Sequence, residues 1–276
     1  MKHEAIRYET IEVSPLTPTI GAEIGGIDLS KLLTEQQFDE IHAALCRHLV
    51  IFFRDQHLTI EEHKAFGRRF GPLHVHPVVG MAEHPEVIEI KADADSTFIA
   101  GEVWHSDVTC DPEPPMGSIL YLHKTPENGG GDTLFASMYR AYETLSEPVR
   151  AMVDGLTAVH DGARVYRDRQ GHSAGRDYPR SEHPVVRTHP VTGRKALYVN
   201  RNFTSHIPGM SKIESDALLD MLYRHSERDD MKCRFKWRPN SIAFWDNRCA
   251  MHQAMWDYYP QTRYGQRITI AGDKPR

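Results

Sequence analysis

The sequence has few cysteines, no long apolar run and no excess of basic residues. Its four cysteines are scattered without a C-x-x-C pair or a zinc-knuckle spacing, which favours reduced, buried thiols over disulfides or a structural zinc site. No stretch approaches the roughly 18 apolar residues of a membrane span, so we expect no membrane partner. A formal net charge of −5 argues against a nucleic-acid partner, because such proteins usually carry a basic surface.

The first residues also lack the apolar segment of a secretory signal, so we expect a cytoplasmic protein. The 276 residues are 40% hydrophobic and 26% charged, an ordinary globular composition. A chain of this length can bury a large core without disulfides. No repeat, low-complexity segment or composition break marks a linker, so we expect a single domain over residues 1–276.

Helix signals are clearest early in the chain. Capping-box spacings predict helices after Thr34, Thr59 and Ser211, and another helix is expected over residues 137–145. The apolar run at 49–53 reads as a buried strand. From residue 87 onward, short strand candidates alternate with turns: VIEI, SILYLH, VVRTH, KALYVN, CRFKW, SIAFW and RITIAG. This texture predicts a mixed α+β fold, mainly β, in which helices lie outside a sandwich or barrel.

Residues with metal-binding chemistry stand together in the stretch GEVWHSDVT, where His105 and Asp107 are two positions apart. On an extended strand both side chains project from one face and could reach one metal ion. With 17 histidines in the chain, about one His-x-Asp pair is expected by chance. His252 supplies a third ligand, and two histidines with one carboxylate form the facial triad of non-haem iron(II) oxygenases. The same ligands also suit zinc.

A strand candidate after Pro260 alternates in a second informative way. Arg263 and Arg267 share one face, and Ile268 and Ile270 lie on the other. A buried guanidinium needs an anion, such as a carboxylate, a phosphate or a sulfonate. Two internal salt bridges would explain the arginines equally well. An iron oxygenase with an oxoacid co-substrate needs one such arginine, and Arg263 is placed to serve.

Along nearly its whole length the chain resembles the taurine dioxygenase (TauD/TfdA) family of iron(II)- and 2-oxoglutarate-dependent dioxygenases. The motifs that carry the resemblance are IGAEIGGIDL, RRFGPLHVHP, WHSDVT, GGDTLFASMYRAYETLS, HPVVRTHPVTGRKALYVN, WDNRCAMH and DYYPQTRYGQRITIAGDKP. The resemblance implies a double-stranded β-helix, which is a jelly-roll barrel with flanking helices, and a homo-oligomer, either a dimer or a tetramer. It also implies an oxidoreductase that releases succinate and CO2.

Position by position, the resemblance assigns the cofactor residues. It implies that His105, Asp107 and His252 bind Fe(II). It implies that the distal carboxylate of the co-substrate 2-oxoglutarate contacts Arg263 and the hydroxyl of Thr133, with O2 as the second co-substrate.

The resemblance also implies a substrate pocket. Arg267 matches the arginine that grips the sulfonate in the taurine enzyme, and His76 matches a histidine beside that anion. Tyr166 and Phe203 fall where that enzyme has aromatic pocket walls. Arg267 together with His76 would make the polar end of the pocket cationic.

Two positions depart from the taurine enzyme. Val79 stands in place of a tyrosine and Gly101 in place of an asparagine, so two polar contacts are lost. A site with fewer hydrogen-bonding groups discriminates less for a small polar ligand. We therefore expect a small anionic substrate with an apolar body: a sulfonate, an alkyl sulfate or an aryloxyalkanoate. The arginine-rich loop at 164–180 could add contacts, although a solvated loop is the default.

Three alternatives remain open from the sequence. The chain could be a taurine dioxygenase proper. It could be a zinc hydrolase on the same three ligands, which would leave Arg263 and Thr133 without a purpose. It could be a non-catalytic relative on the same barrel, for which a damaged triad would be expected.

Overall fold

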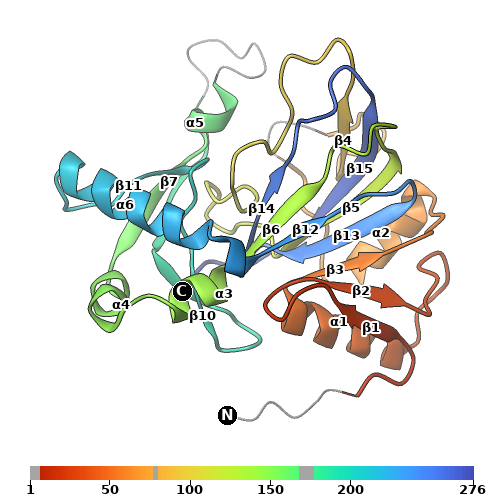
Figure 1. Cartoon of the computed structure of the whole chain (residues 1–276), viewed down its shortest axis with the longest axis horizontal. Coiled ribbons are helices and arrows are strands. Elements are labelled where there is room, and N and C mark those ends of the chain that lie inside the picture. Colours follow the sequence, from red (N-terminus) through yellow and green to blue (C-terminus); the bar gives the residue numbers. More distant parts are fainter. Residues whose placement is uncertain (1–6, 77–79, 168–176) are drawn as a thin grey trace.

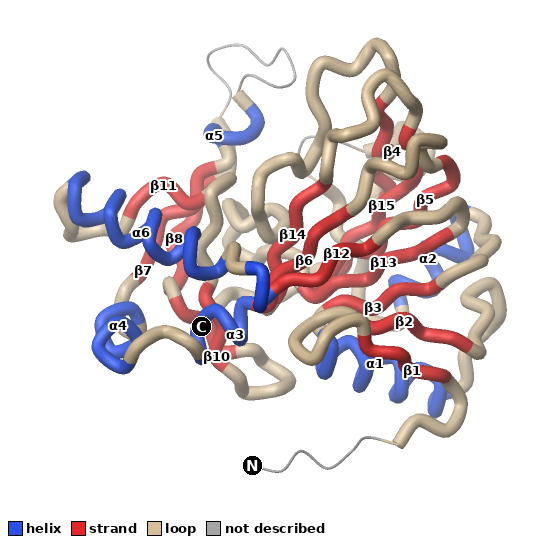
Figure 2. The backbone as a smooth tube through the Cα atoms, viewed as in Figure 1, coloured by secondary structure: helices blue, strands red, loops and turns tan. Residues whose placement is uncertain are grey.

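The computed structural model describes residues 7–76, 80–167 and 177–276. Val79 and the central part of the loop at 164–180 therefore lie outside the described residues. Strands outnumber helices among the described elements, and the helices lie outside the sheets (Figures 1 and 2). The predicted fold class, mixed α+β and mainly β, is confirmed.

The largest sheet has seven strands in the order β1-β2-β3-β13-β5-β15-β4. Only the β2–β3 pair is parallel, and the other neighbours are antiparallel. The strands are β1 (Glu12–Pro15), β2 (Ala22–Gly25), β3 (Val50–Phe53), β4 (Val87–Ala92), β5 (Gly117–Lys124), β13 (Ser241–Asp246) and β15 (Arg263–Ile270).

A smaller sheet faces the inner side of the large one. It has the order β12-β6-β14 and consists of β6 (Thr133–Ser137), β12 (Lys232–Phe235) and β14 (Ala250–Ala254). Aromatic rings join the two sheets: Phe52 of β3 stacks on Phe235 at 3.9 Å between ring centroids and meets Phe135 edge-on at 5.6 Å. All three rings are buried. Such pairs stabilise a core beyond the area that they bury.

Helices cover the outer side of the large sheet. They are α1 (Glu35–His48) and α2 (Ile60–Arg68), and the capping boxes at Thr34 and Thr59 are both present, as predicted. Ile268 and Ile270 of β15 pack in the buried cluster beneath these helices. A Cβ at Gly67 would stand 2.6 Å from Ile268 Cδ1, so a larger residue there would force the Ile268 side chain to move.

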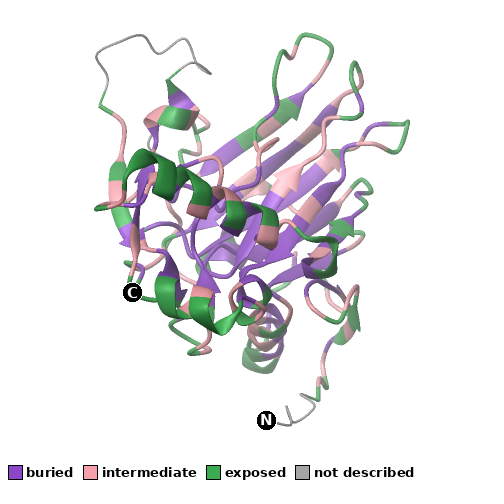
Figure 3. Ribbon diagram, turned by 60° about the vertical axis from the view of Figure 1, so that its left-hand side comes forward, coloured by how far each residue is buried: buried purple, intermediate pink, exposed green. Residues whose placement is uncertain are grey.

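A third group of elements flanks the two facing sheets and lies to their left in Figure 1. It contains the sheet β11-β7-β8 and the pair β10-β9. Their bounds are β7 (Thr157–Asp161), β8 (Arg180–Pro184), β9 (Val186–Thr188), β10 (Lys195–Leu197) and β11 (Thr204–His206). The helices here are α3 (Met138–Glu143), α4 (Glu147–Val153), α5 (Ala163–Tyr166), α6 (Lys212–Ser226) and the short η1 (Asp229–Met231). Buried residues follow the central strands, and exposed ones follow the outer faces of the helices (Figure 3).

Several sequence predictions need correction. His105 and Asp107 do not lie on a strand: His105 makes an isolated bridge with His252, and a turn begins at Asp107. The helix expected over 137–145 ends at Glu143. The strand ladders of the described residues form separate open sheets, without the hydrogen-bonded closure of a barrel.

None of the described helices is both long enough and apolar enough to cross a membrane.

Candidate active site

A cavity of about 450 Å³ opens between the two facing sheets. Strands β5, β6, β13, β14 and β15 supply its inner wall, and the segment 95–108 and helix α5 supply its outer wall. Ten of the eleven residues singled out from the sequence line it: His76, Gly101, His105, Asp107, Thr133, Tyr166, Phe203, His252, Arg263 and Arg267. The eleventh, Val79, is not described.

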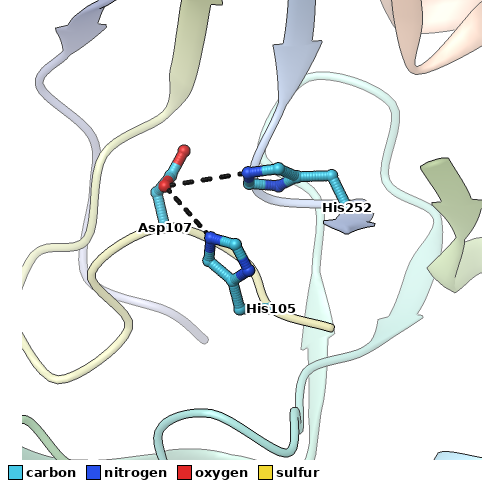
Figure 4. A group of neighbouring side chains, drawn as sticks. All are labelled: His105, Asp107 and His252. Carbon is cyan, nitrogen blue, oxygen red and sulfur yellow. Dashed lines mark ion pairs between the residues drawn. The ribbon is translucent and has the colours of Figure 1, made fainter. Parts of the chain in front are cut away.

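His105, Asp107 and His252 converge at the bottom of this cavity. The distance from Asp107 Oδ1 to His105 Nε2 is 3.6 Å, and that to His252 Nε2 is 4.0 Å (Figure 4). The two imidazole centroids are 4.1 Å apart. Donor atoms at such separations can share one ion, since metal–ligand bonds of about 2.0–2.2 Å place two ligands up to roughly 4 Å apart. The backbones are tied as well, because His105 and His252 exchange backbone hydrogen bonds of 3.1 and 2.8 Å.

The protonation states of the two histidines suit metal binding. His105 Nδ1 lies 2.8 Å from the carbonyl oxygen of Val103. A carbonyl only accepts, so the proton sits on Nδ1 and Nε2 is free for a metal. Burial, followed by the nearby His105, holds the pKa of His252 well below its ordinary value, so this ring is neutral. Neutral imidazole is the form that binds metals.

The carboxylate of Asp107 is ionised although it is buried. Burial alone would raise its pKa, but the guanidinium of Arg267 opposes burial, and the pKa lies well below the usual range. Ser118 Oγ donates to Asp107 Oδ2 at 2.7 Å, and Arg267 Nη1 donates to Oδ1 at 2.8 Å. The ligand set is therefore two imidazole nitrogens and one anionic oxygen, which fits Fe(II) with open coordination positions.

Arg263 lies on β15 with its side chain 5% exposed. Its Nε donates to the carbonyl of Gly131 at 3.1 Å, and Nη2 donates to Thr133 Oγ1 at 3.4 Å. Both acceptors are neutral, and the structure records no ion pair of Arg263 with a carboxylate of the described residues. Burial lowers the pKa of Arg263 to about 10, which leaves it charged at neutral pH. This buried cation needs an anion from solution.

Trp237 completes this anion site and was missed from the sequence. Its indole Nε1 donates to Thr133 Oγ1 at 2.9 Å, so the hydroxyl accepts from both Trp237 and Arg263. The hydroxyl proton of Thr133 is then available to an anion in the cavity. Gly131 has a φ of +81°, and a Cβ there would stand 3.0 Å from Arg263 Cδ. The only sequence signal for Trp237 is the alternation of CRFKW, which gives no hint of its partner.

Arg267 lies four residues further along β15, on the same face. It is not an unpaired cation, because its Nη1 forms a 2.8 Å ion pair with Asp107 Oδ1, while its Nε is buried without a partner among the described residues. Burial, followed by the charge of Arg267, lowers the pKa of His76 to about 4. His76 is therefore neutral at pH 7. The cationic character of this end of the cavity comes from Arg267 alone, which corrects the contribution expected from His76.

Aromatic side chains form the wall beside Arg267. Tyr166 Oη lies 3.4 Å from His76 Nε2, and the Tyr166 and Phe203 rings are 6.1 Å apart. Gly101 has a φ of +87°, and a Cβ there would stand 3.2 Å from His105 Cε1. The positive φ and this close approach to the His105 ring both favour glycine at position 101.

A second group of potential metal ligands, His189, Asp246 and Cys249, is also fully buried. Here the donor atoms are already occupied. Arg248 donates to both oxygens of Asp246 at 2.9 and 2.6 Å, and His189 Nε2 lies 3.0 Å from Oδ2. His189 Nδ1 accepts two backbone N–H groups. This group is a buried salt-bridge network.

A buried two-histidine, one-carboxylate site beside a buried arginine that lacks a carboxylate partner among the described residues defines a class: mononuclear metal oxygenases that bind an oxoacid. Comparison with known proteins narrows this class. The family model "Taurine catabolism dioxygenase TauD, TfdA family" matches residues 12–269. The chain therefore belongs to this family.

Named relatives agree in reaction class and differ in substrate. An alpha-ketoglutarate-dependent sulfate ester dioxygenase of Pseudomonas putida is 36% identical, over 96% of this chain and 91% of that protein. An (S)-phenoxypropionate/alpha-ketoglutarate-dioxygenase of Sphingobium herbicidovorans is 33% identical, over 95% of both. The crystal structure of a taurine dioxygenase from Burkholderia xenovorans matches with a TM-score of 0.85 and 40% identity, over 97% of this chain and 93% of that one. The predicted enzyme class and its Fe(II), 2-oxoglutarate and O2 are confirmed.

Proposed function

We propose that this enzyme hydroxylates a small organic anion with an apolar body, coupled to the conversion of 2-oxoglutarate to succinate and CO2. The observation that carries the proposal is the pair of arginines on one face of β15, with Arg263 and Arg267 lining one cavity around the His105–Asp107–His252 group. The guanidinium of Arg263 would bind the co-substrate, and the guanidinium of Arg267 faces the part of the cavity left for the substrate.

Each residue has a distinct role in this proposal. His105, Asp107 and His252 hold Fe(II), which when bound supplies the activation of O2. Thr133 and Arg263 receive the distal carboxylate of 2-oxoglutarate, one through its hydroxyl proton and the other through its charge. The buried walls exclude water and thereby strengthen each of these electrostatic contacts.

Charge balance supports an anionic substrate. The largely buried ionised groups that line the cavity are Asp107, Arg263 and Arg267. With Fe(II) added they carry three net positive charges, and 2-oxoglutarate neutralises two of them. Because buried charges are stable only when compensated, the remaining charge favours a monoanionic substrate. Arg267 is its binding partner, since this side chain retains donors beyond the one that Asp107 uses.

The aromatic and aliphatic wall sets the rest of the substrate. Tyr166 and Phe203 line the cavity beside His76, next to Arg267, so the body of the substrate is apolar. Sulfate esters, sulfonates and aryloxyalkanoates satisfy both demands, and the names of the relatives fall in these classes. Hydroxylation at the carbon bearing the ester or ether oxygen gives a product that decomposes to an aldehyde or a ketone.

Oxygen uptake and succinate formation, measured across a matched panel, test the proposal. The panel contains alkyl sulfates, alkanesulfonates, taurine and aryloxyalkanoates, each beside a neutral analogue of the same shape. Anionic members with apolar bodies should stimulate oxygen uptake with one succinate formed per substrate consumed. A Zn(II)-loaded sample should show neither. Equal turnover of neutral and anionic members would refute the assignment of the substrate class.

The same proposal extends to the architecture. The chain alternates between the two facing sheets from β12 to β13, β14 and β15, which is the winding of a double-stranded β-helix. We assign this jelly-roll form to the two sheets, within a single domain. Assembly into a dimer or tetramer belongs to the same proposal, and light scattering coupled to size-exclusion chromatography tests it.

A further inference from the structure

Four buried polar side chains surround Asp107 on the side away from the cavity. They are Ser106, Ser118, Trp245 and Asn247. Of these four, only Trp245 lines the cavity in which a substrate or 2-oxoglutarate would bind. Asn247 belongs to the segment WDNR. No part of the proposed reaction uses its amide or the Ser118 hydroxyl.

The orientation of the Asn247 amide follows from its partners. Its Oδ1 accepts the indole N–H of Trp245 at 3.0 Å and the backbone N–H of Asp107 at 3.2 Å. Both partners can only donate, so oxygen and not nitrogen must occupy this position. The Nδ2 group then points to Ser118 Oγ, 3.1 Å away.

The direction of the next hydrogen bond is decided in turn. Ser118 Oγ accepts from Asn247 Nδ2, so its own proton is available for Asp107 Oδ2 at 2.7 Å. Asn247 therefore holds Asp107 at two points, directly at the backbone and through Ser118 at the carboxylate. Asp107, Ser118 and Asn247 are each at most 2% exposed as whole residues, so water does not compete for these bonds.

We propose that Asn247 and Ser118 are positioning residues that commit Asp107 to bind the metal through Oδ1 alone. The Ser118 hydroxyl occupies Oδ2, so Oδ1, which also accepts Arg267 Nη1 at 2.8 Å, faces the Nε2 atoms of the two histidines at 3.6 and 4.0 Å. This role rests on the metal site proposed above. A ligand carboxylate held in this way keeps its geometry before the metal arrives, and the loss of such supporting contacts weakens metal affinity in other proteins.

The hydrogen bonds of Asn247 also support a second proposed metal ligand, His252, through the packing of Trp245. Trp245, whose N–H is bound by Asn247, packs its ring against His252 with the centroids 4.6 Å apart. The Nδ1 atom of His252 is buried and has no hydrogen-bond partner among the described side chains and backbone. Its ring orientation therefore depends on neighbours such as Trp245, and Asn247 orients that indole.

Metal binding by the whole protein tests the proposal, with Mn(II) alone as the probe. Binding is followed by calorimetry and by the loss of the free-ion signal in electron paramagnetic resonance. Ser118→Ala should weaken Mn(II) binding by about 10- to 100-fold, while the melting temperature of the metal-free protein changes no more than in a matched control. The control is Ser226→Ala, which removes a hydroxyl that is equally buried in α6 and donates to the carbonyl of Tyr223 at 3.0 Å.

Asn247→Ala and the double variant complete the experiment. If both residues act through Asp107, the double variant should bind Mn(II) about as weakly as the weaker single variant, since coupled residues are not additive. Ser118→Ala binding within twofold of the parent, or fully multiplicative losses, overturns the proposal. Asp107→Ala separates the two levels: Mn(II) binding that survives in this variant refutes the metal site itself, not only its supports.

Discussion

The two halves of the cavity are built differently. On the 2-oxoglutarate side, Arg263 and Thr133 lie on strands and have neighbours that fix each donor: Trp237 and the carbonyl of Gly131. On the substrate side, Arg267 also lies on a strand, but the aromatic wall beside it comes from Tyr166 of α5 and from the connecting segment with Asn202 and Phe203. A strand side chain is positioned by the sheet, whereas a loop side chain depends on a segment that varies among relatives.

This difference explains why relatives of one reaction class carry different substrate names. In the proposed function, the half built on strands binds what every turnover needs, namely the metal and the oxoacid. The half with loop walls would bind what distinguishes one enzyme from another, in line with the general location of specificity on connecting segments. The two sides meet at Asp107, which faces both histidines and also pairs with Arg267.

The largest effect is expected at this meeting point. Asp107→Ala should abolish both substrate oxidation and the slow, substrate-free decay of 2-oxoglutarate, because the only anionic metal ligand is lost. Succinate formation with and without substrate measures both. Asp111→Ala is the control, an acidic residue four positions on that pairs with His74 at 3.3 Å and does not line the cavity. Residual decay at the parent rate would mean that the metal is held elsewhere.

A smaller effect, confined to one side, is expected from Arg263→Ala. Each charge-assisted hydrogen bond contributes about 1.5–3 kcal/mol, so the KM for 2-oxoglutarate should rise about 10- to 100-fold. Mn(II) affinity and the KM for the organic substrate should stay within twofold. Steady-state kinetics with each reactant varied in turn measures this split. A similar rise in the KM for 2-oxoglutarate and in the KM for the organic substrate would contradict the assignment of Arg263 to the 2-oxoglutarate side alone.

Arg267→Ala tests the other side. We expect about a tenfold loss of turnover for an anionic substrate, because one charge-assisted contact is removed, and little change for a neutral analogue. Decay of 2-oxoglutarate without substrate should persist, since Arg263 and the three metal ligands remain. Anionic and neutral substrates are compared in the same oxygen-uptake assay. Equal losses for both would assign Arg267 to the support of Asp107 and not to substrate charge.

The smallest effect is that of pH on substrate affinity. Burial lowers the pKa of His76 to about 4, and arginine stays charged throughout, so neither His76 nor Arg267 titrates between pH 6 and 8. Substrate affinity should change less than about twofold in this range. A gain is expected only as pH falls toward 4, where protonated His76 adds a positive charge. An affinity that rises already near pH 6.5 and becomes flat in His76→Gln would contradict this assignment.

Local chemistry in the sequence determined a large part of this molecule. The capping boxes at Thr34, Thr59 and Ser211 are all present, because the groups that satisfy a helix end lie within three residues of it. The alternation after Pro260 correctly separated the two faces of β15, since side chains of a strand alternate. Motifs long enough to identify the family were also sufficient to predict residues that line one cavity in the structure.

Only the tertiary structure decided which distant groups meet. Arg263 and Thr133 are 130 residues apart, and Ser118 and Asn247 are 129 apart, so no local pattern could pair them. An extended strand would have put His105 and Asp107 on one face, but an isolated bridge to His252 and a turn that begins at Asp107 bring the ligands together instead. His76 looked cationic in the sequence, yet burial makes it neutral. Hydrogen-bond direction, burial and charge pairing arise from packing between segments, and they determine how the same residue types work at this site.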